Sequence, residues 1–135
     1  MAMQFMTIPH LGHHLEICFS VSNLVASIEY YRQLGFRIYT GGPDESYCSM
    51  KAQSVYISLF ENEFIEKEFG NPFILNFRGG NIVKLHNYLK KFDLDFHYEN
   101  IRADGTGNLL FHDPDGVPIF LDTSPDEERI DTIDQ

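Results

Sequence analysis

Cysteine is scarce in this chain of 135 residues, and tryptophan is absent. The two cysteines, Cys18 and Cys48, are too few to form a disulfide framework. Both lie in segments with the character of β-strands, where a buried free thiol is the common outcome. We therefore expect two free thiols and no structural disulfide.

Long apolar runs and positive charge are scarce as well. The apolar runs stay far below the roughly 20 residues that cross a bilayer, and the opening MAMQFMTIPHLGHH has no basic stretch followed by an apolar one. Lys and Arg number 10 against 20 Asp and Glu, which gives a net charge of −10, whereas a phosphate-binding surface needs the opposite balance. We expect a soluble, cytoplasmic protein with neither a nucleic-acid nor a membrane partner.

Apolar side chains, in contrast, are plentiful. The chain is 43% hydrophobic and 22% charged, which is enough apolar area for one folded domain. Residues 122–135 contain six acids and one arginine and lack hydrophobic periodicity. We therefore expect 123–135 to form a solvated acidic tail and 1–12 to form an N-terminal segment before the domain.

The first half of the sequence indicates a strand, a helix and three strands. Polar and apolar residues alternate over 14–21, which predicts a half-buried strand. Ser22 and Asn23 are both suitable N-caps for a helix over 24–34, which Gly35 ends. Strand-like segments follow at 36–40, 46–51 and 54–60.

The second half repeats that order. After an acidic connector at 61–72 come a strand at 73–77, a helix that begins at Ile82, and three strand segments within 92–122. At an offset of 58 residues, Asn-Leu-Val at 23–25 matches Asn-Ile-Val at 81–83. The same element order occurring twice favours an internal duplication.

Two motifs carry a resemblance to a known family. The segment FSVSNLVASIEYYRQLGFRIY at 19–39 and the segment FHDPDGVPIFLD at 111–122 are similar to motifs of the vicinal oxygen chelate superfamily. That superfamily includes glyoxalase I, bleomycin resistance proteins and extradiol dioxygenases, and the resemblance covers 13–122. It implies an α+β fold in which two tandem βαβββ modules, 13–62 and 72–122, form a curved mixed sheet shaped as a cup with helices outside.

Strand parity predicts which side chains line that cup. One face of the central strands is aliphatic, as expected under a helix. The other face would line the cup and supplies the candidate ligand-binding residues His14, Glu16, Cys18, Tyr56, Ser58, Phe60, Asn76, Arg78 and Phe120.

Enzymes of the superfamily hold a divalent cation with His, Gln or Glu side chains from both modules. Carried over by motif, the four ligand positions fall on Glu16, Ser58, Phe120 and Ile74, or on Phe73 in place of Ile74 if the register slips by one. Only Glu16 is a good ligand, and a transition metal needs several converging donors. We therefore expect no metal and no cofactor.

A rearranged metal site is the alternative, with His14, His112 or Asp122 beside Glu16. The histidines at 10, 13 and 14 are spaced like a metal-binding tract, but we expect an N-terminal segment of this kind to be solvated.

Two functions remain open. The missing ligand set is similar to the metal-free bleomycin-resistance branch, whose members sequester a cationic drug, typically as homodimers. This implies a small-molecule-binding homodimer that sequesters an aromatic or cationic compound. The alternative is a glyoxalase-like lyase or isomerase, or a dioxygenase, with Glu16 as catalytic base or as a ligand in a degenerate metal site, and Arg78 as the partner of an enolate. The same residues also have structural interpretations. Glu16 would be a carboxylate at the solvated rim of its strand or paired with Arg78, and Cys18 would be an inert thiol.

Overall fold

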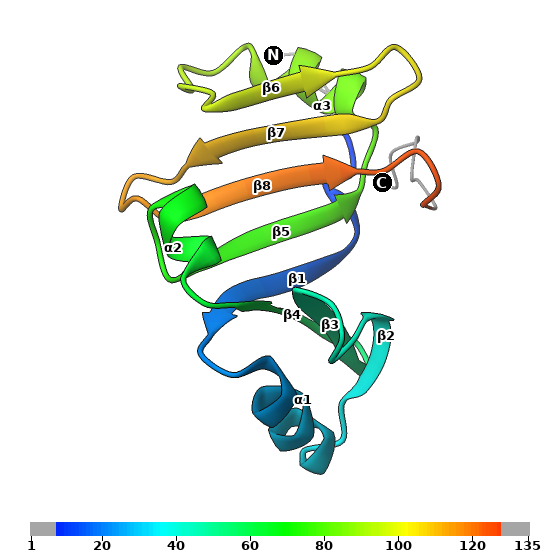
Figure 1. The fold of residues 1–135 in the computed structure, drawn as a ribbon. Coiled ribbons are helices and arrows are strands. Elements are labelled where there is room, and N and C mark those ends of the chain that lie inside the picture. The colour runs from blue at the N-terminus through cyan, green and yellow to red at the C-terminus, as the bar shows by residue number, and fades with distance from the viewer. Residues whose placement is uncertain (1–7, 128–135) are drawn as a thin grey trace.

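One strongly curved sheet of eight strands runs through residues 8–127, the part of the chain that the computed structural model describes (Figure 1). Three helices complete the fold, and the predicted α+β architecture is confirmed. The elements are β1 (Gly12–Val21), α1 (Leu24–Gln33), β2 (Arg37–Gly41), β3 (Tyr47–Ala52), β4 (Val55–Glu61), α2 (Phe64–Phe69), β5 (Phe73–Gly79), α3 (Ile82–Leu89), β6 (Tyr98–Ile101), β7 (Gly107–His112) and β8 (Pro118–Thr123).

The two halves repeat one pattern of strand pairing. The strand order is β2-β3-β4-β1-β5-β8-β7-β6, with β1 parallel to β4 and β5 parallel to β8. The antiparallel pairing of β1 with β5 joins the halves into one sheet. Each half also begins its helix with the same cap, because the side chains of Asn23 and Asn81 accept hydrogen bonds from the backbone N–H of Ala26 and Lys84. The repeated element order predicted from the sequence is confirmed.

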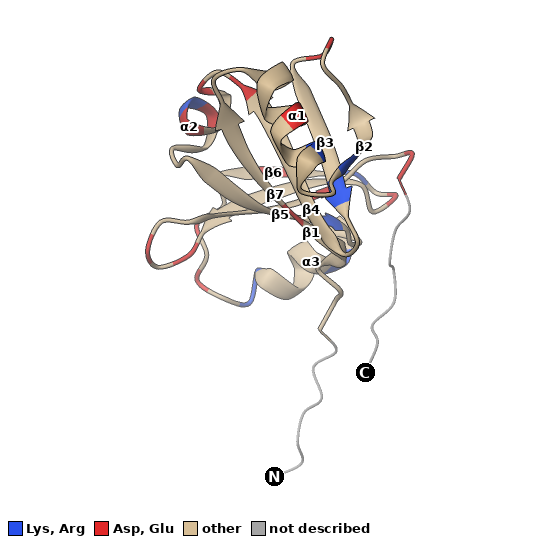
Figure 2. Ribbon diagram, turned by 90° about the horizontal axis from the view of Figure 1, so that it is seen from below, with Lys and Arg blue, Asp and Glu red and all other residues tan. Residues whose placement is uncertain are grey.

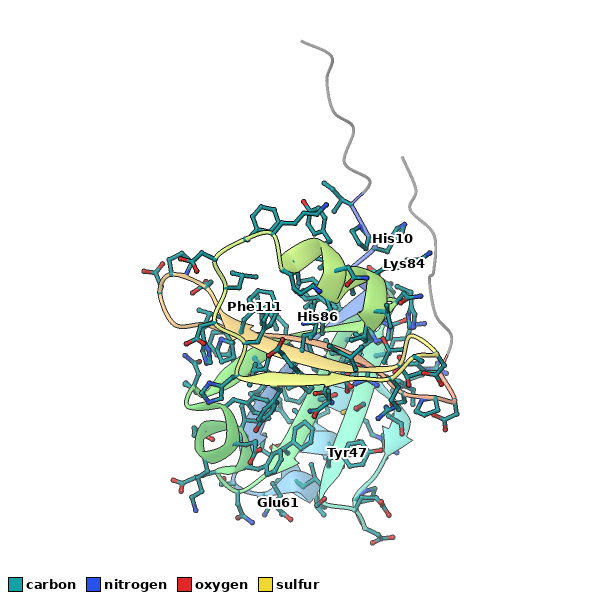
Figure 3. All side chains as sticks on the ribbon, turned by 90° about the horizontal axis from the view of Figure 1, so that it is seen from above. His10, Tyr47, Glu61, Lys84, His86 and Phe111 are labelled. Carbon is teal, nitrogen blue, oxygen red and sulfur yellow. The ribbon has the colours of Figure 1, made fainter. Side chains whose placement is uncertain are left out.

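The helices α1 and α3 cover the convex face of the sheet. Leu24 and Ile28 of α1 pack on a buried cluster from β3 and β4, and Ile82 and Leu85 of α3 pack on β7 and β8. Figure 3 shows Phe111 on the side of β7 that faces α3, whereas Tyr47 lies on the opposite, concave side. Two separate apolar layers therefore stabilise the outside of the cup and leave its inside for other side chains.

The connector between the halves forms α2, which packs on the concave face, in front of β5 and β8 in Figure 1. Ile65 is only 1% exposed and forms a cluster with Cys18 and Ile74. The backbone N–H of Ile65 donates to Ser20 Oγ at 2.9 Å, and the Tyr98 hydroxyl donates to Glu68 at 2.5 Å, which fastens α2 to both halves. Helix α2 thus fills one half of the cup with apolar side chains.

The two cysteines and the histidines near the N-terminus were also the subject of predictions from the sequence. Cys18 and Cys48 are buried and free, as predicted. The expectation of a solvated histidine segment was wrong for His14, which is half-buried in β1 and lies 2.8 Å from Glu16, whereas His13 of the same strand is exposed. Within the described residues, no helix is long and apolar enough to span a membrane.

Candidate functional site

The half of the cup that α2 leaves open is a polar cavity of about 590 Å³. Side chains from β1 to β5, from β8 and from the segment after β8 line it: His13, His14, Glu16, Cys18, Tyr39, Thr40, Tyr47, Ser49, Ser58, Phe60, Asn76, Arg78, Asp122, Ser124, Asp126 and Glu127.

Glu16 is the buried carboxylate of this cavity, with 5% of its surface exposed. Strand β1 places it between Tyr56 of β4 and Asn76 of β5 in the sheet register. Its Oε1 accepts a hydrogen bond from Ser58 Oγ at 2.6 Å, and its Oε2 accepts from the Tyr39 hydroxyl and lies 2.8 Å from His14 Nε2. Three donors on three different strands therefore converge on one carboxylate.

These donors fix the charge of the group. Burial alone would raise the pKa of Glu16, but the hydrogen bonds from His14, Ser58 and Tyr39 and the positive charge of Arg78 hold that pKa below its usual value. Burial and the bond to Glu16 raise the pKa of Tyr39, so its phenol keeps its proton. At neutral pH the site therefore contains an ionised Glu16 carboxylate beside a neutral Tyr39 phenol.

Further contacts hold the neighbours of Glu16 in place. Ser49 Oγ lies 2.6 Å from Ser58 Oγ. The His14 ring stacks on the Tyr56 ring with centroids 3.8 Å apart, and its Nδ1 lies 2.8 Å from the Nδ1 of His13. Because the stack and the strand register fix the imidazole, the His14 Nε2 stays directed at the carboxylate.

A second charged cluster surrounds Arg78 on β5. Its guanidinium lies 2.6 Å from Asp122 Oδ2 and 2.6 Å from Glu127 Oε1, with longer contacts to Asn76 at 3.3 Å and Ser124 at 3.4 Å. Burial opposes the charge, but the two carboxylates raise the pKa of Arg78. The pKa of Asp122 is raised by burial and by nearby Glu127, in spite of Arg78. Arg78 therefore pairs with Asp122 and Glu127, and the pairing with Glu16 considered from the sequence was wrong. A solvated position for Glu16 was wrong as well, because that side chain is buried.

The segment after β8 differs from the solvated tail that we expected. Thr123, the last residue of β8, is fully buried, and Glu127 beyond it pairs with Arg78 and accepts from the backbone N–H of Ser124 at 2.7 Å. Figure 2 shows acidic residues, in red, at the end of the described chain. The expectation fails for Thr123, which is buried in β8, and for Glu127, whose charge the guanidinium of Arg78 compensates, whereas Pro125 and Asp126 are exposed as expected. Residues 128–135 lie outside the described part.

Seven of the nine candidate residues line the cavity: His14, Glu16, Cys18, Ser58, Phe60, Asn76 and Arg78. The other two do not. Tyr56 lies behind His14 and lines a second cavity of about 550 Å³, and Phe120 packs against Phe69 of α2 with ring centroids 5.5 Å apart. Tyr39, Tyr47 and Ser49 line the cavity but were not predicted from the sequence. The alternation of β3 places Tyr47 and Ser49 on one face and could have indicated them.

Cys18 is present in the cavity wall but has the properties of an inert thiol. Burial and the negative charge of Glu16 raise its pKa to about 12. A nucleophilic cysteine needs the opposite environment, one that favours the thiolate. These properties favour a packing role for Cys18, which contacts Ile65 and Ile74.

The residues at the four superfamily ligand positions do not fit a divalent cation. Glu16 is engaged by three donors, Ser58 gives its hydrogen to Glu16, Ile74 packs on Ile65, and Phe120 packs on Phe69. Within 8–127, no group of three or more His, Cys, Asp and Glu side chains is placed to hold a metal ion. A bound cation would have to displace the donors on Glu16 and would gain few ligands.

We therefore predict that the purified protein contains well under one equivalent of transition metal, because Glu16 is the one strong donor at the four positions. Elemental analysis of protein expressed without chelators measures this directly. Near-stoichiometric nickel, manganese, zinc or iron would contradict the prediction.

Comparisons with known proteins give the fold. No protein-family model matches the sequence, and no curated protein is similar enough in sequence to be matched. Among solved structures, a glyoxalase/bleomycin resistance protein/dioxygenase superfamily member from Vibrio splendidus 12B01 is 16% identical, with a TM-score of 0.60 over 82% of this chain and 98% of that one.

Two further structures share the architecture. A protein described as an NAD-dependent benzaldehyde dehydrogenase from Legionella pneumophila is 18% identical, with a TM-score of 0.63 over 81% of this chain and 97% of its own. A hypothetical protein from Bacillus halodurans C-125 is 12% identical, with a TM-score of 0.59 over 88% and 99%. At these identities the likeness concerns the fold and not the activity. The described chain has the curved-sheet fold of a glyoxalase/bleomycin resistance protein/dioxygenase superfamily structure.

Proposed function

We propose that this protein is a small-molecule-binding member of that superfamily, and that the cavity around Glu16 binds a cationic compound without a metal ion. The observation that carries the proposal is the buried, ionised Glu16 with three donors and no metal-ligand set around it. This carboxylate already has the charge that attracts a cation and needs no metal ion to organise it.

The charge of the cavity lining supports a cation. Its acids are Glu16, Asp122, Asp126 and Glu127, and Arg78 is the one Lys or Arg among the lining residues. The excess of negative charge lies in a partly enclosed space, where screening by water is weaker than on an open surface. The tail and the connector account for much of the net charge of the whole chain, and Asp126 and Glu127 of the tail contribute directly to the acidity of the cavity.

Aromatic rings in the lining support the same ligand class. Tyr39, Tyr47 and Phe60 line the cavity, and Tyr47 and Phe60 stack with centroids 5.8 Å apart. A cation over such a ring gains about 0.5–2 kcal/mol, and the flat faces suit an aromatic body. An aromatic ammonium compound therefore matches both the charge and the shape of the lining.

The catalytic alternative finds less support in the geometry. A general base works best with a pKa near the working pH, whereas the donors on Glu16 hold its pKa low. An enolate would need a free cationic partner, but Arg78 is engaged by Asp122 and Glu127. Both features favour a fixed binding site over proton transfer at Glu16.

The substitution Glu16→Gln tests the proposal. We expect benzylammonium to bind the unmodified protein and its affinity to fall at least about tenfold in the variant, because a charge-assisted hydrogen bond of about 1.5–3 kcal/mol is lost. Isothermal titration calorimetry measures both affinities, and thermal unfolding checks that the variant is folded. A matched control is Glu29→Gln on the exposed side of α1, which should bind as the parent does. Unchanged affinity in Glu16→Gln would remove Glu16 from the site.

We also propose that the protein is a homodimer that associates through the convex face. Between α1 and α3, the central strands expose Leu15, Ile17, Val55 and Phe73, with Ile17 38% exposed. Contiguous apolar side chains at the centre of a sheet are unusual on the surface of a monomer and are typical of an interface. A second copy that presents the same strip would cover it.

This proposal predicts that Ile17→Lys shifts the protein from dimer to monomer, because two buried ammonium groups would face each other at the twofold interface. Light scattering after size-exclusion chromatography measures the mass against that of one 15.6 kDa chain. The control Val25→Lys, at a side chain 58% exposed on α1, should stay dimeric. A monomeric parent protein, or a dimeric Ile17→Lys variant, would contradict the proposed interface.

A further inference from the structure

Every hydrogen bond at the Glu16 side chain is donated to its carboxylate. An ionised carboxylate can only accept hydrogen bonds, so the Tyr39 and Ser58 hydroxyls and the His14 Nε2–H must donate to it. Since a hydroxyl carries one hydrogen, Tyr39 and Ser58 have none left for a ligand. We call the part of the lining around Glu16, formed by His14, Glu16, Tyr39, Ser49 and Ser58, the inner wall. The ionised carboxylate fixes which of its groups donate and which accept hydrogen bonds.

The direction of the hydrogen bond between Ser49 and Ser58 is fixed in the same way. Ser58 has given its hydrogen to Glu16, so the Ser49 hydroxyl must donate across the 2.6 Å contact to the oxygen of Ser58. The Ser49 oxygen keeps its lone pairs, as does the Tyr39 oxygen. Glu16 itself has about four acceptor sites, and three are filled. The inner wall thus offers acceptors from three residues that all line the cavity.

The strongest donor group in the lining is not free to balance these acceptors. The four terminal N–H groups of Arg78 are directed at Asn76, Asp122, Ser124 and Glu127. The Asn76 amide group donates to the Phe120 carbonyl at 3.1 Å. A ligand at the inner wall therefore meets oxygen lone pairs, which are satisfied by hydrogen-bond donors on the ligand or remain unpaired at a free-energy cost.

We infer that the cavity selects cations that carry N–H donors, namely primary ammonium, amidinium or guanidinium groups, over quaternary ammonium groups of the same charge. This inference rests on the proposed function, because it specifies which cations the site accepts. Charge alone attracts both kinds, but only the first kind satisfies the lone pairs of Glu16, Tyr39 and Ser49.

A methylation series tests the inference at constant charge and with one aromatic ring. Benzylammonium, benzyldimethylammonium and benzyltrimethylammonium carry three, one and no N–H donors. We expect the affinity of the unmodified protein, measured by isothermal titration calorimetry, to fall stepwise and at least about tenfold from the first to the last. The variant Ser49→Ala should weaken benzylammonium several-fold and leave benzyltrimethylammonium unchanged. The control Ser54→Ala, at an exposed turn outside this cavity, should alter neither.

The outcomes distinguish a failure of the inference about N–H donors from a failure of the proposed cation site. Equal or tighter binding of benzyltrimethylammonium would overturn the inference about donors and would leave the cation site itself standing. The same holds for a Ser49→Ala variant that weakens all three compounds equally. If none of the three compounds binds, both the proposed function and the inference fail.

Discussion

Replacing Arg78 with methionine is expected to lower the free energy of unfolding by about 3 kcal/mol at pH 7. Arg78 forms short ion pairs with Asp122 and Glu127, and all three side chains are largely buried. Methionine keeps much of the apolar length of the arginine, so the loss comes mainly from two carboxylates left without a cation. Removing one partner of a buried pair is costly because the remaining charge is neither solvated nor compensated.

Urea unfolding measures this loss, and pH provides an internal check. Without Arg78, the folded-state pKa of Asp122, already raised by burial, rises further. The folded variant then binds protons more readily than its unfolded chain. Its stability relative to the parent therefore recovers as the pH falls into the range in which the Asp122 carboxyl becomes protonated. The additional substitution Asp122→Asn should also restore part of the stability at pH 7.

Two results would contradict this description of the cluster. One is a loss below about 1 kcal/mol at pH 7, which is the magnitude of an exposed ion pair. The other is a loss that does not depend on pH. Arg37→Met on β2, where the arginine is exposed, is the matched control and should change stability by less than about 0.5 kcal/mol.

The second large effect is expected at Ile65, the apolar anchor of α2. Ile65→Ala should lower the free energy of unfolding by about 3 kcal/mol, because the side chain is almost fully buried in a cluster with Cys18 and Ile74. Part of this loss is the transfer of apolar surface to water, and part is the void that remains between α2 and the sheet. Urea unfolding at neutral pH measures the change.

The matched control for Ile65→Ala is Val25→Ala on the exposed side of α1, which should change stability by less than about 0.5 kcal/mol. If the two variants were equally stable, α2 would not be packed on the concave face as described. The cup would then be open along its full length, and Phe120, which packs on Phe69 of α2, would be available to a ligand.

Much of the fold was predictable because its determinants are local. Alternation placed β1, the capping candidates Ser22 and Asn23 placed the start of α1, and the repeat of the element order indicated two equivalent halves. Each of these signals depends on residues close in sequence, where backbone geometry and burial act directly. The antiparallel pairing of β1 with β5 was not predicted, because it joins strands far apart in the sequence and no local pattern indicates it.

The site was predictable only as far as strand parity reaches. Parity indicated Glu16, Ser58 and Arg78 correctly as lining residues. It gave no reason for Phe120 to lie under α2, because the acidic connector carries no strong sign that it folds back into the cup. It also could not pair Arg78 with Glu127, since that contact joins residues 49 positions apart and depends on how the chain turns after β8.

Charge counting shows the same limit. Summed over the sequence, the acidic excess has little meaning for a ligand, since much of it lies in the connector and the C-terminal segment. Once the chain is folded, Asp126 and Glu127 of that segment stand at the cavity with Glu16 and Asp122. The affinity for a cationic ligand therefore depends on where the fold brings the acids and not on how many the sequence contains.

The most direct test of the central claim is the calorimetric titration of benzylammonium into the unmodified protein and into Glu16→Gln under the same conditions. The account predicts measurable binding to the unmodified protein, one site per chain, and an affinity at least about tenfold lower in the variant. Equal affinities for the two proteins, or no binding to either, would contradict a cation site built on the carboxylate of Glu16.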